Sequence, residues 1–441
     1  MKIPFSFWQT FTCPLLALLF ALPVYAQYGD TDEYRIVGYR ADAVDNPIAD
    51  LSARLESGET RLRYRENRGY LDALLDALSI DPHSQILVFS KTSLQYQHIS
   101  AATPRAVYFS DTTYVGWVQG TDIVEIATMD AKLGLVFYTF DNTREPLHYF
   151  NRETQRCLVC HDSNGTMGGG TPLLLAHSSV YSVDSDNLLN VTGEENTTDR
   201  TPVRDRWGGW YVTGQHGKQV HLGNLQLADK GELARLDSFR VGNVDTLEGG
   251  RWFDTAPYKE ATSDIVALMV FEHQLTVQNQ ISYVKFKAPA VLERLGYPQI
   301  TASARWDSLP ERARQALARM LDKLVDGLLL RESAPLEDAI AGNAEFTHWF
   351  QAQGPRDSKG RSLHSLDLKH QLFTYPLSYL VYSRDMDTLP RYARDYVWQS
   401  LLSALKNQDR GRSAWSVARQ REALEILTET PPASMPRLPA D

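Results

Sequence analysis

The sequence Cys157-Leu158-Val159-Cys160-His161 brings two thiols and an imidazole into one short segment. In a helix, side chains three and four positions apart lie on one face, so Cys157, Cys160 and His161 would point the same way. Two thiols at this spacing can each add across a vinyl group of a haem, and the adjacent His then lies under the iron as its proximal ligand. The segment therefore predicts one covalently attached haem c, with Cys157 and Cys160 as its thioether links and His161 as an iron ligand.

Cysteine usage favours this interpretation. The full sequence holds three cysteines. The third, Cys13, lies in an N-terminal segment that we expect to be removed. The mature protein would then commit both of its cysteines to this one motif.

Three other uses of a Cys-x-x-Cys pair remain open from the sequence. A zinc site needs further ligands, commonly a second cysteine pair or paired histidines, and the chain has no second cysteine pair. A thioredoxin-like pair opens a helix, whereas the sequence that follows here, Asp162-Ser163-Asn164-Gly165-Thr166, is typical of a loop. A disulfide between Cys157 and Cys160 is the third alternative, and it would be strained.

The N-terminal segment, residues 1–26, has the pattern of a secretory signal peptide. Lys2 supplies a positive charge, residues 15–22 form an apolar stretch, and Val24-Tyr25-Ala26 ends in a small residue. We therefore expect cleavage before Gln27 and export to the periplasm, the side of the bacterial inner membrane on which haem is attached covalently. The alternative is an uncleaved membrane anchor, for which the apolar stretch is short.

The charge balance bears on the partners of the protein. The chain has 54 Asp and Glu against 45 Lys and Arg, a net charge of −9 at pH 7. An acidic protein is a poor binder of nucleic acid and of anionic membranes, and it is compatible with a basic redox partner protein. The longest apolar run in the predicted helices, Ile265–Phe271, is too short to span a bilayer, so we expect no membrane span after signal cleavage.

The predicted fold class is α+β, with a β-rich part that carries the haem motif and a mostly helical part after it. The first part, residues 27–255, should begin with a helix at 70–78 and a buried strand at 85–90. β-branched and aromatic runs separated by turn residues then predict an antiparallel sheet, with strands at 106–109, 114–118, 123–129 and 133–140. The haem motif follows this sheet, so we expect the haem segment to pack against it.

A second group of ring and ligand residues lies at 206–225. This stretch holds two His, two Trp and one Arg in a glycine-rich frame. Such a composition suits a cofactor pocket. We expect Arg206, Trp207 and His216 to contact the haem. His221, which apolar residues flank, is the candidate distal ligand of the iron, and the haem segment should face this stretch.

The second part, residues 256–430, is predicted to be helical. Helices are expected at 263–284, 311–330, 335–351, 366–384, 389–406 and 414–428. Ser308-Leu309-Pro310-Glu311 has the form of a capping box before the second of these, and Pro376 should break or kink the fourth. Residues 431–441 hold four prolines and are expected to be disordered.

The order of motifs resembles a group of exported bacterial proteins that contain a cytochrome c domain. The matching segments extend over most of the mature chain: Pro104-Arg-Ala-Val-Tyr-Phe109, Tyr114-Val-Gly-Trp-Val118, Cys157–His161, Arg206-Trp-Gly-Gly-Trp-Tyr-Val-Thr-Gly214 and Ser378-Tyr-Leu-Val-Tyr-Ser383. The resemblance implies haem and export, and it implies no particular substrate. The group also tends to carry a Gly-His-type stretch after the haem motif, like that around His216 and His221. The chain does not resemble the small class I cytochromes, so their downstream Met ligand does not transfer to it.

The sixth iron ligand separates the possible functions, because a strong ligand suits electron transfer and an open position suits catalysis. Besides His216 and His221, the sequence offers Met167 and His177 close to the motif, and Met269 with His273 on a later helix. An iron with no sixth protein ligand is the remaining alternative.

Three functions are compatible with one haem c. The first is periplasmic electron transfer, in which the iron cycles between its ferrous and ferric states. The second is a mono-haem redox enzyme acting on peroxide or a nitrogen oxide, with His216 and Arg206 as acid–base group and charge stabiliser. The third, a haem-based sensor, ranks last because no signalling domain is visible.

The haem motif yields the first prediction. The double substitution Cys157→Ser and Cys160→Ser should abolish the covalent linkage, because no thiol then remains to form a thioether. The wild-type protein should keep its haem through denaturation and acid extraction, and the variant should lose it. A stoichiometric zinc content without haem in the wild type would contradict this prediction.

Overall fold

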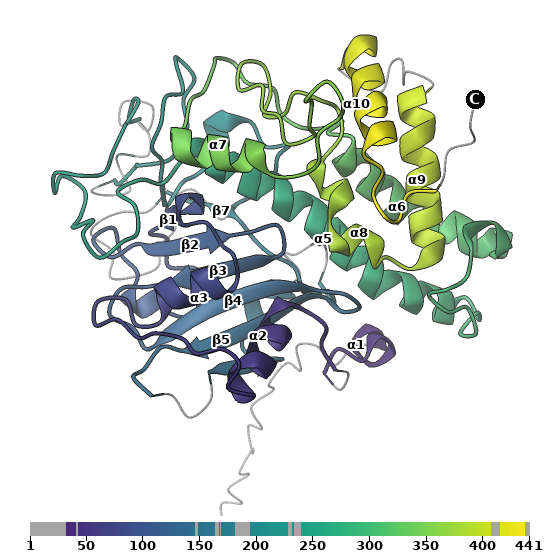
Figure 1. The fold of residues 1–441 in the computed structure, drawn as a ribbon, viewed down its shortest axis with the longest axis horizontal. Helices are drawn as coiled ribbons and strands as arrows, with labels where there is room; N and C mark the ends of the chain where they lie inside the picture. Colours follow the sequence, from purple (N-terminus) through teal and green to yellow (C-terminus); the bar gives the residue numbers. More distant parts are fainter. Residues whose placement is uncertain are drawn as a thin grey trace, which may run out of the picture.

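The computed structural model describes residues 32–40, 43–145, 149–163, 167, 169–180, 195–227, 232, 240–406 and 415–436. The predicted signal peptide therefore lies outside the described residues. Within them, a seven-stranded antiparallel sheet packs against a long central helix, and further helices gather at the C-terminal end (Figure 1). The predicted α+β class is confirmed.

The large sheet has the strand order β6-β5-β4-β3-β2-β1-β9. Its strands are β1 (Ile86–Val88), β2 (Arg105–Phe109), β3 (Thr113–Trp117), β4 (Ile123–Asp130), β5 (Gly134–Asp141), β6 (Phe150–Glu153) and β9 (Trp210–Tyr211). The predicted strands match β1 to β5 closely, because β-branched and aromatic residues pack well on a pleated surface. A second, two-stranded sheet pairs β7 (His177–Ser178) with β8 (Glu195–Asn196).

The two faces of the large sheet carry different elements. Helices α2 (Pro47–Glu56) and α3 (Leu71–Ala77) lie over one face, as Figure 1 shows. The other face, which we call the α5 face, packs against helix α5 (Ile265–Arg294). On the α5 face, the Tyr114 hydroxyl donates a hydrogen bond to Gln278 Oε1 at 2.5 Å. The haem motif lies on this same side of the sheet.

Helix α5 runs for 30 residues and is buried on nearly all sides. The sequence predicted it to end at Val284, but it continues through Pro289 to Arg294. A helix that is enclosed all round lacks the polar stripe that marks an amphipathic helix. Its extra turns are therefore hard to see in the sequence. The buried Lys285 adds to the difficulty; its Nζ donates to Asp130 O at 3.0 Å and to Thr388 Oγ1 at 2.9 Å.

The remaining helices are shorter. They comprise α1 (Asp32–Val37), α4 (Leu158–His161), α6 (Glu311–Leu328), α7 (Ala344–Ala352), α8 (Arg384–Asp387), α9 (Arg391–Lys406) and α10 (Val417–Glu429), with 3-10 turns at Pro82–Ser84, Tyr96–His98, Val203–Asp205, Trp306–Ser308 and Tyr379–Tyr382. The prediction of a helix at 366–384 is wrong for most of its length. Leu366 instead bridges to Phe373, and the segment packs as buried loop and 3-10 turn. Its apolar residues face the core without helical hydrogen bonds, which is a tertiary effect that local spacing does not reveal.

The predicted capping box at Ser308 is also wrong. Helix α6 begins after Pro310, which has no side-chain cap. The Ser308 hydroxyl donates instead to Arg305 O at 2.7 Å within a 3-10 turn. Proline at the N-cap position displaces the serine from the distance at which a capping box works.

Both predicted parts share one core. A single cluster of buried apolar side chains reaches from Tyr34 to Leu427 and includes strand and helix residues alike. Residues 431–436, which the sequence placed in a disordered tail, join the same core at Met435, and Ser434 N donates to Asp387 Oδ1 at 3.1 Å. Residues 437–441 lie outside the described residues. Across the described segments, no helix has the length and apolar character needed to cross a membrane.

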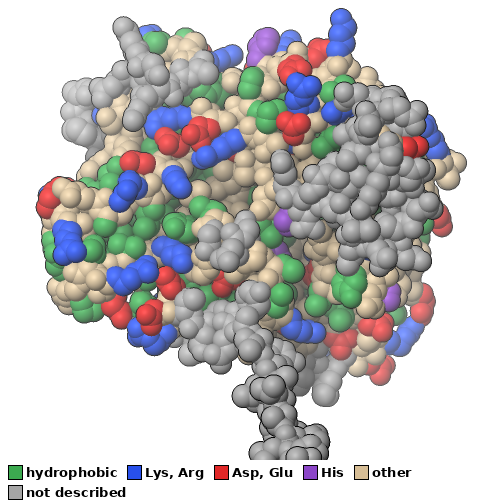
Figure 2. All heavy atoms as spheres, turned by 180° about the vertical axis from the view of Figure 1, so that it is seen from behind, with side chains coloured by type: hydrophobic (Ala, Val, Ile, Leu, Met, Phe, Trp, Pro, Cys, Tyr) green, Lys and Arg blue, Asp and Glu red, His purple; other side chains and the backbone are tan. Residues whose placement is uncertain are grey.

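The surface of the molecule mixes charges of both signs. Figure 2 shows Lys and Arg side chains interspersed with Asp and Glu over the described part of the reverse face. No extended basic stripe is seen on that part of the face, which accords with the net charge of −9.

Two serines test the corrected helix starts. Ser416 is the N-cap of α10 and accepts a hydrogen bond from Arg419 N at 3.3 Å, whereas Ser308 caps no helix. Ser416→Ala should lower the free energy of unfolding by about 1 kcal/mol, and Ser308→Ala by less than about 0.5 kcal/mol. Urea unfolding measures both free energies. A larger loss of stability for Ser308→Ala than for Ser416→Ala would support the predicted capping box.

Candidate haem site

The haem motif forms a single helical turn, Cys157–His161, which we call the attachment turn. Cys157 has helical backbone angles, and Cys157 O accepts hydrogen bonds from Cys160 N at 3.3 Å and His161 N at 3.0 Å. This turn places Cys157, Cys160 and His161 on one side. The buried Leu158 anchors the other side in the core, and Val159 is 51% exposed. The two thiols form no disulfide with each other.

Hydrogen bonding fixes the orientation of the His161 ring. Its Nδ1 lies 2.7 Å from Leu173 O. A carbonyl oxygen can only accept, so Nδ1 carries the proton and Nε2 keeps its lone pair for a metal. Iron-ligating histidines are commonly held this way by a backbone carbonyl. Leu173 N also donates to His161 O at 3.0 Å, so two hydrogen bonds join His161 to Leu173.

Burial keeps the His161 ring neutral, as a metal ligand must be. The pKa of His161 is lowered to about 4, chiefly by burial and to a smaller extent by Arg105, while the Leu173 hydrogen bond and Glu125 act in the opposite direction. Phe137 packs beside the ring with the two ring centroids 4.5 Å apart. Burial also raises the pKa of Cys157 to about 12, so its thiol is protonated before any reaction with a vinyl group.

Asp162 holds the loop that follows the motif. Its Oδ2 accepts a hydrogen bond from the Tyr34 hydroxyl at 2.6 Å, and its Oδ1 accepts one from Thr171 N at 2.8 Å. The buried carboxylate thereby links helix α1 to both ends of the loop. Within this loop Gly170 has a φ of +70°, and a Cβ there would lie 2.7 Å from Lys287 Nζ of α5, so the loop approaches α5 closely at this glycine.

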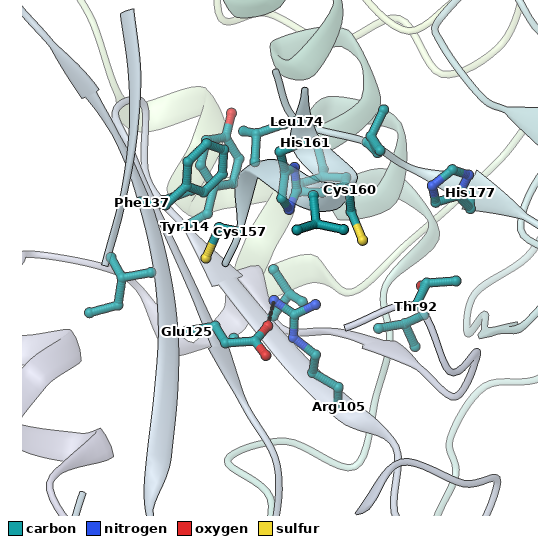
Figure 3. Close-up of a pocket in the computed structure, with 18 of the residues that line it drawn as sticks. Thr92, Arg105, Tyr114, Glu125, Phe137, Cys157, Cys160, His161, Leu174 and His177 are labelled. Carbon is teal, nitrogen blue, oxygen red and sulfur yellow. Dashed lines mark ion pairs between the residues drawn. The ribbon is translucent and has the colours of Figure 1, made fainter. Parts of the chain in front are cut away.

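The motif opens on a cavity of about 550 Å³ between the attachment turn, the α5 face of the sheet and the segment around Leu174. Cofactor pockets commonly have about 300–1,000 Å³. Apolar side chains form much of the lining, among them Val107, Tyr114, Phe137, Leu174, Trp210 and Phe271. In Figure 3 the sulfur atoms of Cys157 and Cys160 and the His161 ring point toward the same open space.

These residues meet the requirements of a haem c. Two thiols for the thioether links and a neutral imidazole nitrogen border one apolar cavity of suitable size. In the described part of the chain, no group of three or more His, Cys, Asp or Glu side chains is arranged to hold a metal ion. A haem iron needs no such group, because the porphyrin nitrogens provide its equatorial ligands.

A charged pair lies in the same cavity. Arg105 Nη2 is 2.9 Å from Glu125 Oε2, and both residues line the space in front of His161 (Figure 3). Sequence reasoning did not single out either residue. The available signal was a charged residue just before the predicted strand 106–109 and another within the predicted strand 123–129, with a glycine on the predicted strand between them, since a strand glycine often marks a close approach.

The stretch 206–225 contributes one side chain to the cavity, Trp210, whose Nε1 donates to His177 O at 2.7 Å. Arg206, Trp207, His216 and His221 are not among the described residues that line it. The structure therefore gives no geometric support to the expected haem contacts of these four side chains.

The four side chains have other partners. Arg206 Nη1 donates to Glu272 Oε2 at 2.7 Å, and both side chains are 1% exposed. The His216 and His221 rings pack together with their centroids 4.6 Å apart, and Trp207 packs on His221. Arg206 thus belongs to a buried ion pair, and Trp207, His216 and His221 form a buried ring cluster. The sequence of such a stretch resembles that of a cofactor pocket because both need the same residue types.

Of the other distal candidates, only His177 borders the cavity. Met167 lies at a neighbouring cavity of about 360 Å³, where Gln280 Nε2 is 3.9 Å from its sulfur. His273 is fully buried, with Nδ1 2.9 Å from Asp199 Oδ2 and Nε2 2.8 Å from Ser378 Oγ. This Asp–His–Ser chain ties α5 to two loops, and its serine is 0% exposed and borders neither of the two cavities described here, so it is a structural cross-link.

No family model, no curated protein and no solved structure matches the chain.

The buried His221 predicts a pH dependence. Burial, reinforced by His216, lowers its pKa to about 3, whereas the unfolded chain protonates a His near pH 6.5. Between these values the unfolded state binds more protons, so stability is lost as the pH falls. From pH 7 to pH 5 the wild type should lose about 2 kcal/mol more than His221→Gln in urea unfolding. Equal losses would mean that His221 is accessible to protons in the folded state.

Proposed function

We propose that this protein binds one covalent haem c and exchanges electrons through it. Cys157 and Cys160 would hold the haem by thioether bonds, and His161 would be the proximal ligand. When bound, the haem supplies an iron that cycles between two oxidation states.

One observation carries the proposal: the two thiols and the carbonyl-oriented imidazole of a single helical turn open on the same apolar cavity. The spacing of the motif alone is compatible with a zinc site, a redox dithiol or a disulfide. A zinc site needs additional protein ligands, and neither a dithiol nor a disulfide needs an adjacent cavity of about 550 Å³. The cavity and the fixed tautomer of His161 are what a haem needs.

Electron transfer with a redox partner protein, in the periplasm, is the function that we propose first. The exposed Val159 and Cys160 place the attachment turn at the surface, where an electron could pass to a partner. The apolar lining would exclude water from the haem, which is one of the factors that set a reduction potential.

A second candidate function is redox catalysis on a small molecule at a haem with an open or weakly ligated distal position. The observation that favours it is the Arg105–Glu125 pair, which puts charged groups in the cavity next to its apolar lining residues. Among the described lining residues there is no methionine, and His177 is the only histidine besides His161.

Absorption spectra of the reduced protein, with and without carbon monoxide, test these proposals together. A haem c that transfers electrons through a closed site should give a low-spin spectrum that carbon monoxide leaves unchanged. A haem open for catalysis should bind carbon monoxide. A protein purified from a host competent for haem attachment, yet without haem absorption, would contradict both.

The same spectra test the placement of the buried histidines. His216→Ala and His221→Ala should each leave the haem spectrum unchanged, because neither side chain lines the cavity. His161→Ala is the matched comparison and should disturb the spectrum strongly, since it removes the proximal ligand. A change of spin state in His221→Ala would show that this residue reaches the iron after all.

A further inference from the structure

We infer that Arg105 holds a small inorganic anion on the side of the haem iron opposite His161. The inference rests on the proposed haem and goes beyond it by naming the chemical class of the distal ligand and the residue that binds it. It also assigns a role to Glu125, which would position the Arg105 guanidinium.

The position of the pair carries the first step. Arg105 lies on β2 and Glu125 on β4, and both line the haem cavity. In Figure 3 they lie across the open space from His161, with the sulfur atoms of Cys157 and Cys160 at an intermediate level.

The sheet is shaped to hold the guanidinium. Gly116 lies on β3, between the strands of Arg105 and Glu125, and is paired directly with Glu125. A Cβ at Gly116 would lie 2.7 Å from Arg105 Cζ and nearer still to two guanidinium nitrogens. Any other residue at this position would displace the guanidinium, so the glycine creates the space in which Arg105 lies.

Hydrogen bonding and packing leave one donor nitrogen of Arg105 available. Glu125 has both oxygens engaged, since Oε2 pairs with Arg105 Nη2 and Oε1 accepts a hydrogen bond from the Ser93 hydroxyl at 2.9 Å. Arg105 Nε is buried and has no hydrogen-bond partner among the described residues. Nε lies against Gly116 and is closed to the cavity, so the guanidinium nitrogen left for a bound acceptor is Nη1.

The charges favour an anion. The Glu125 carboxylate is already matched by Arg105 and Ser93. A ferric haem and a guanidinium with an unused N–H both attract negative charge. The ligand must be small, because the haem itself would take up most of a cavity of about 550 Å³.

The test measures azide and imidazole binding to the ferric haem protein by absorption titration. Azide is an anion that can accept the Arg105 hydrogen bond, and imidazole is a neutral iron ligand that serves as control. Arg105→Met should weaken azide binding by about tenfold or more, and imidazole binding should change by less than about threefold. Lys91→Met is the matched control variant, because it removes another cation that lines the cavity, and its azide affinity should stay within about twofold of the wild type.

A second variant protects the test against a folding defect of Arg105→Met. Gly116→Ala keeps Arg105 but displaces its guanidinium, so it should also weaken azide selectively. Glu125→Gln should weaken azide less than Arg105→Met, since it only loosens the position of the guanidinium.

Three results would overturn the inference while leaving the haem proposal intact. Azide affinity could be unaffected in Arg105→Met and Gly116→Ala, as expected if Arg105 pairs with a haem propionate. Azide and imidazole could weaken in parallel, which would mean a general change of the cavity. The wild-type iron could fail to bind azide while the iron of His177→Ala binds it, which would mean that His177 occupies the distal position. A protein without covalent haem would instead refute the proposed function itself.

Discussion

The hydrogen bond between His161 Nδ1 and Leu173 O is the interaction on which the site depends. It fixes the tautomer, leaves the other ring nitrogen free for a metal and joins the attachment turn to the segment around Leu174, which lines the cavity. Asp162 supports the same geometry by linking the intervening loop to Tyr34 of α1. A motif of five residues becomes a binding site only because these contacts hold the ring and the two thiols at one opening.

The large sheet and α5 supply the rest of the cavity. Side chains alternate between the two faces along each strand, and this places Val107, Gly116 and Glu125 on the α5 face, next to the attachment turn. Helix α5 packs against the same face, and its Phe271 is part of the apolar lining of the cavity. A long chain is needed to form this cavity, because the sheet, the helix and the attachment turn come from three distant parts of the sequence.

The parts of the fold and site that could be predicted from the sequence are those determined by local residue types and spacing. The first five strands and the attachment turn follow from the residue types and their spacing, so their positions agree with the structure. The helix expected at 366–384 failed because burial by neighbouring elements, and not helical hydrogen bonding, orders that segment. Arg206, Trp207, His216 and His221 have the composition of a pocket but are buried in the core, where Arg206 pairs with Glu272 and the three rings pack together. Arg105 and Glu125 were missed because their meeting depends on strand register, which no single segment reveals.

Peptide mapping of the exported wild-type protein by mass spectrometry is the most direct test of the central claim. After proteolysis, the account predicts that one peptide, the one that contains Cys157, Cys160 and His161, carries the mass of a single haem joined through both sulfurs. Recovery of that peptide unmodified, or with its two cysteines joined as a disulfide, from a host that attaches haem to other proteins would contradict the account.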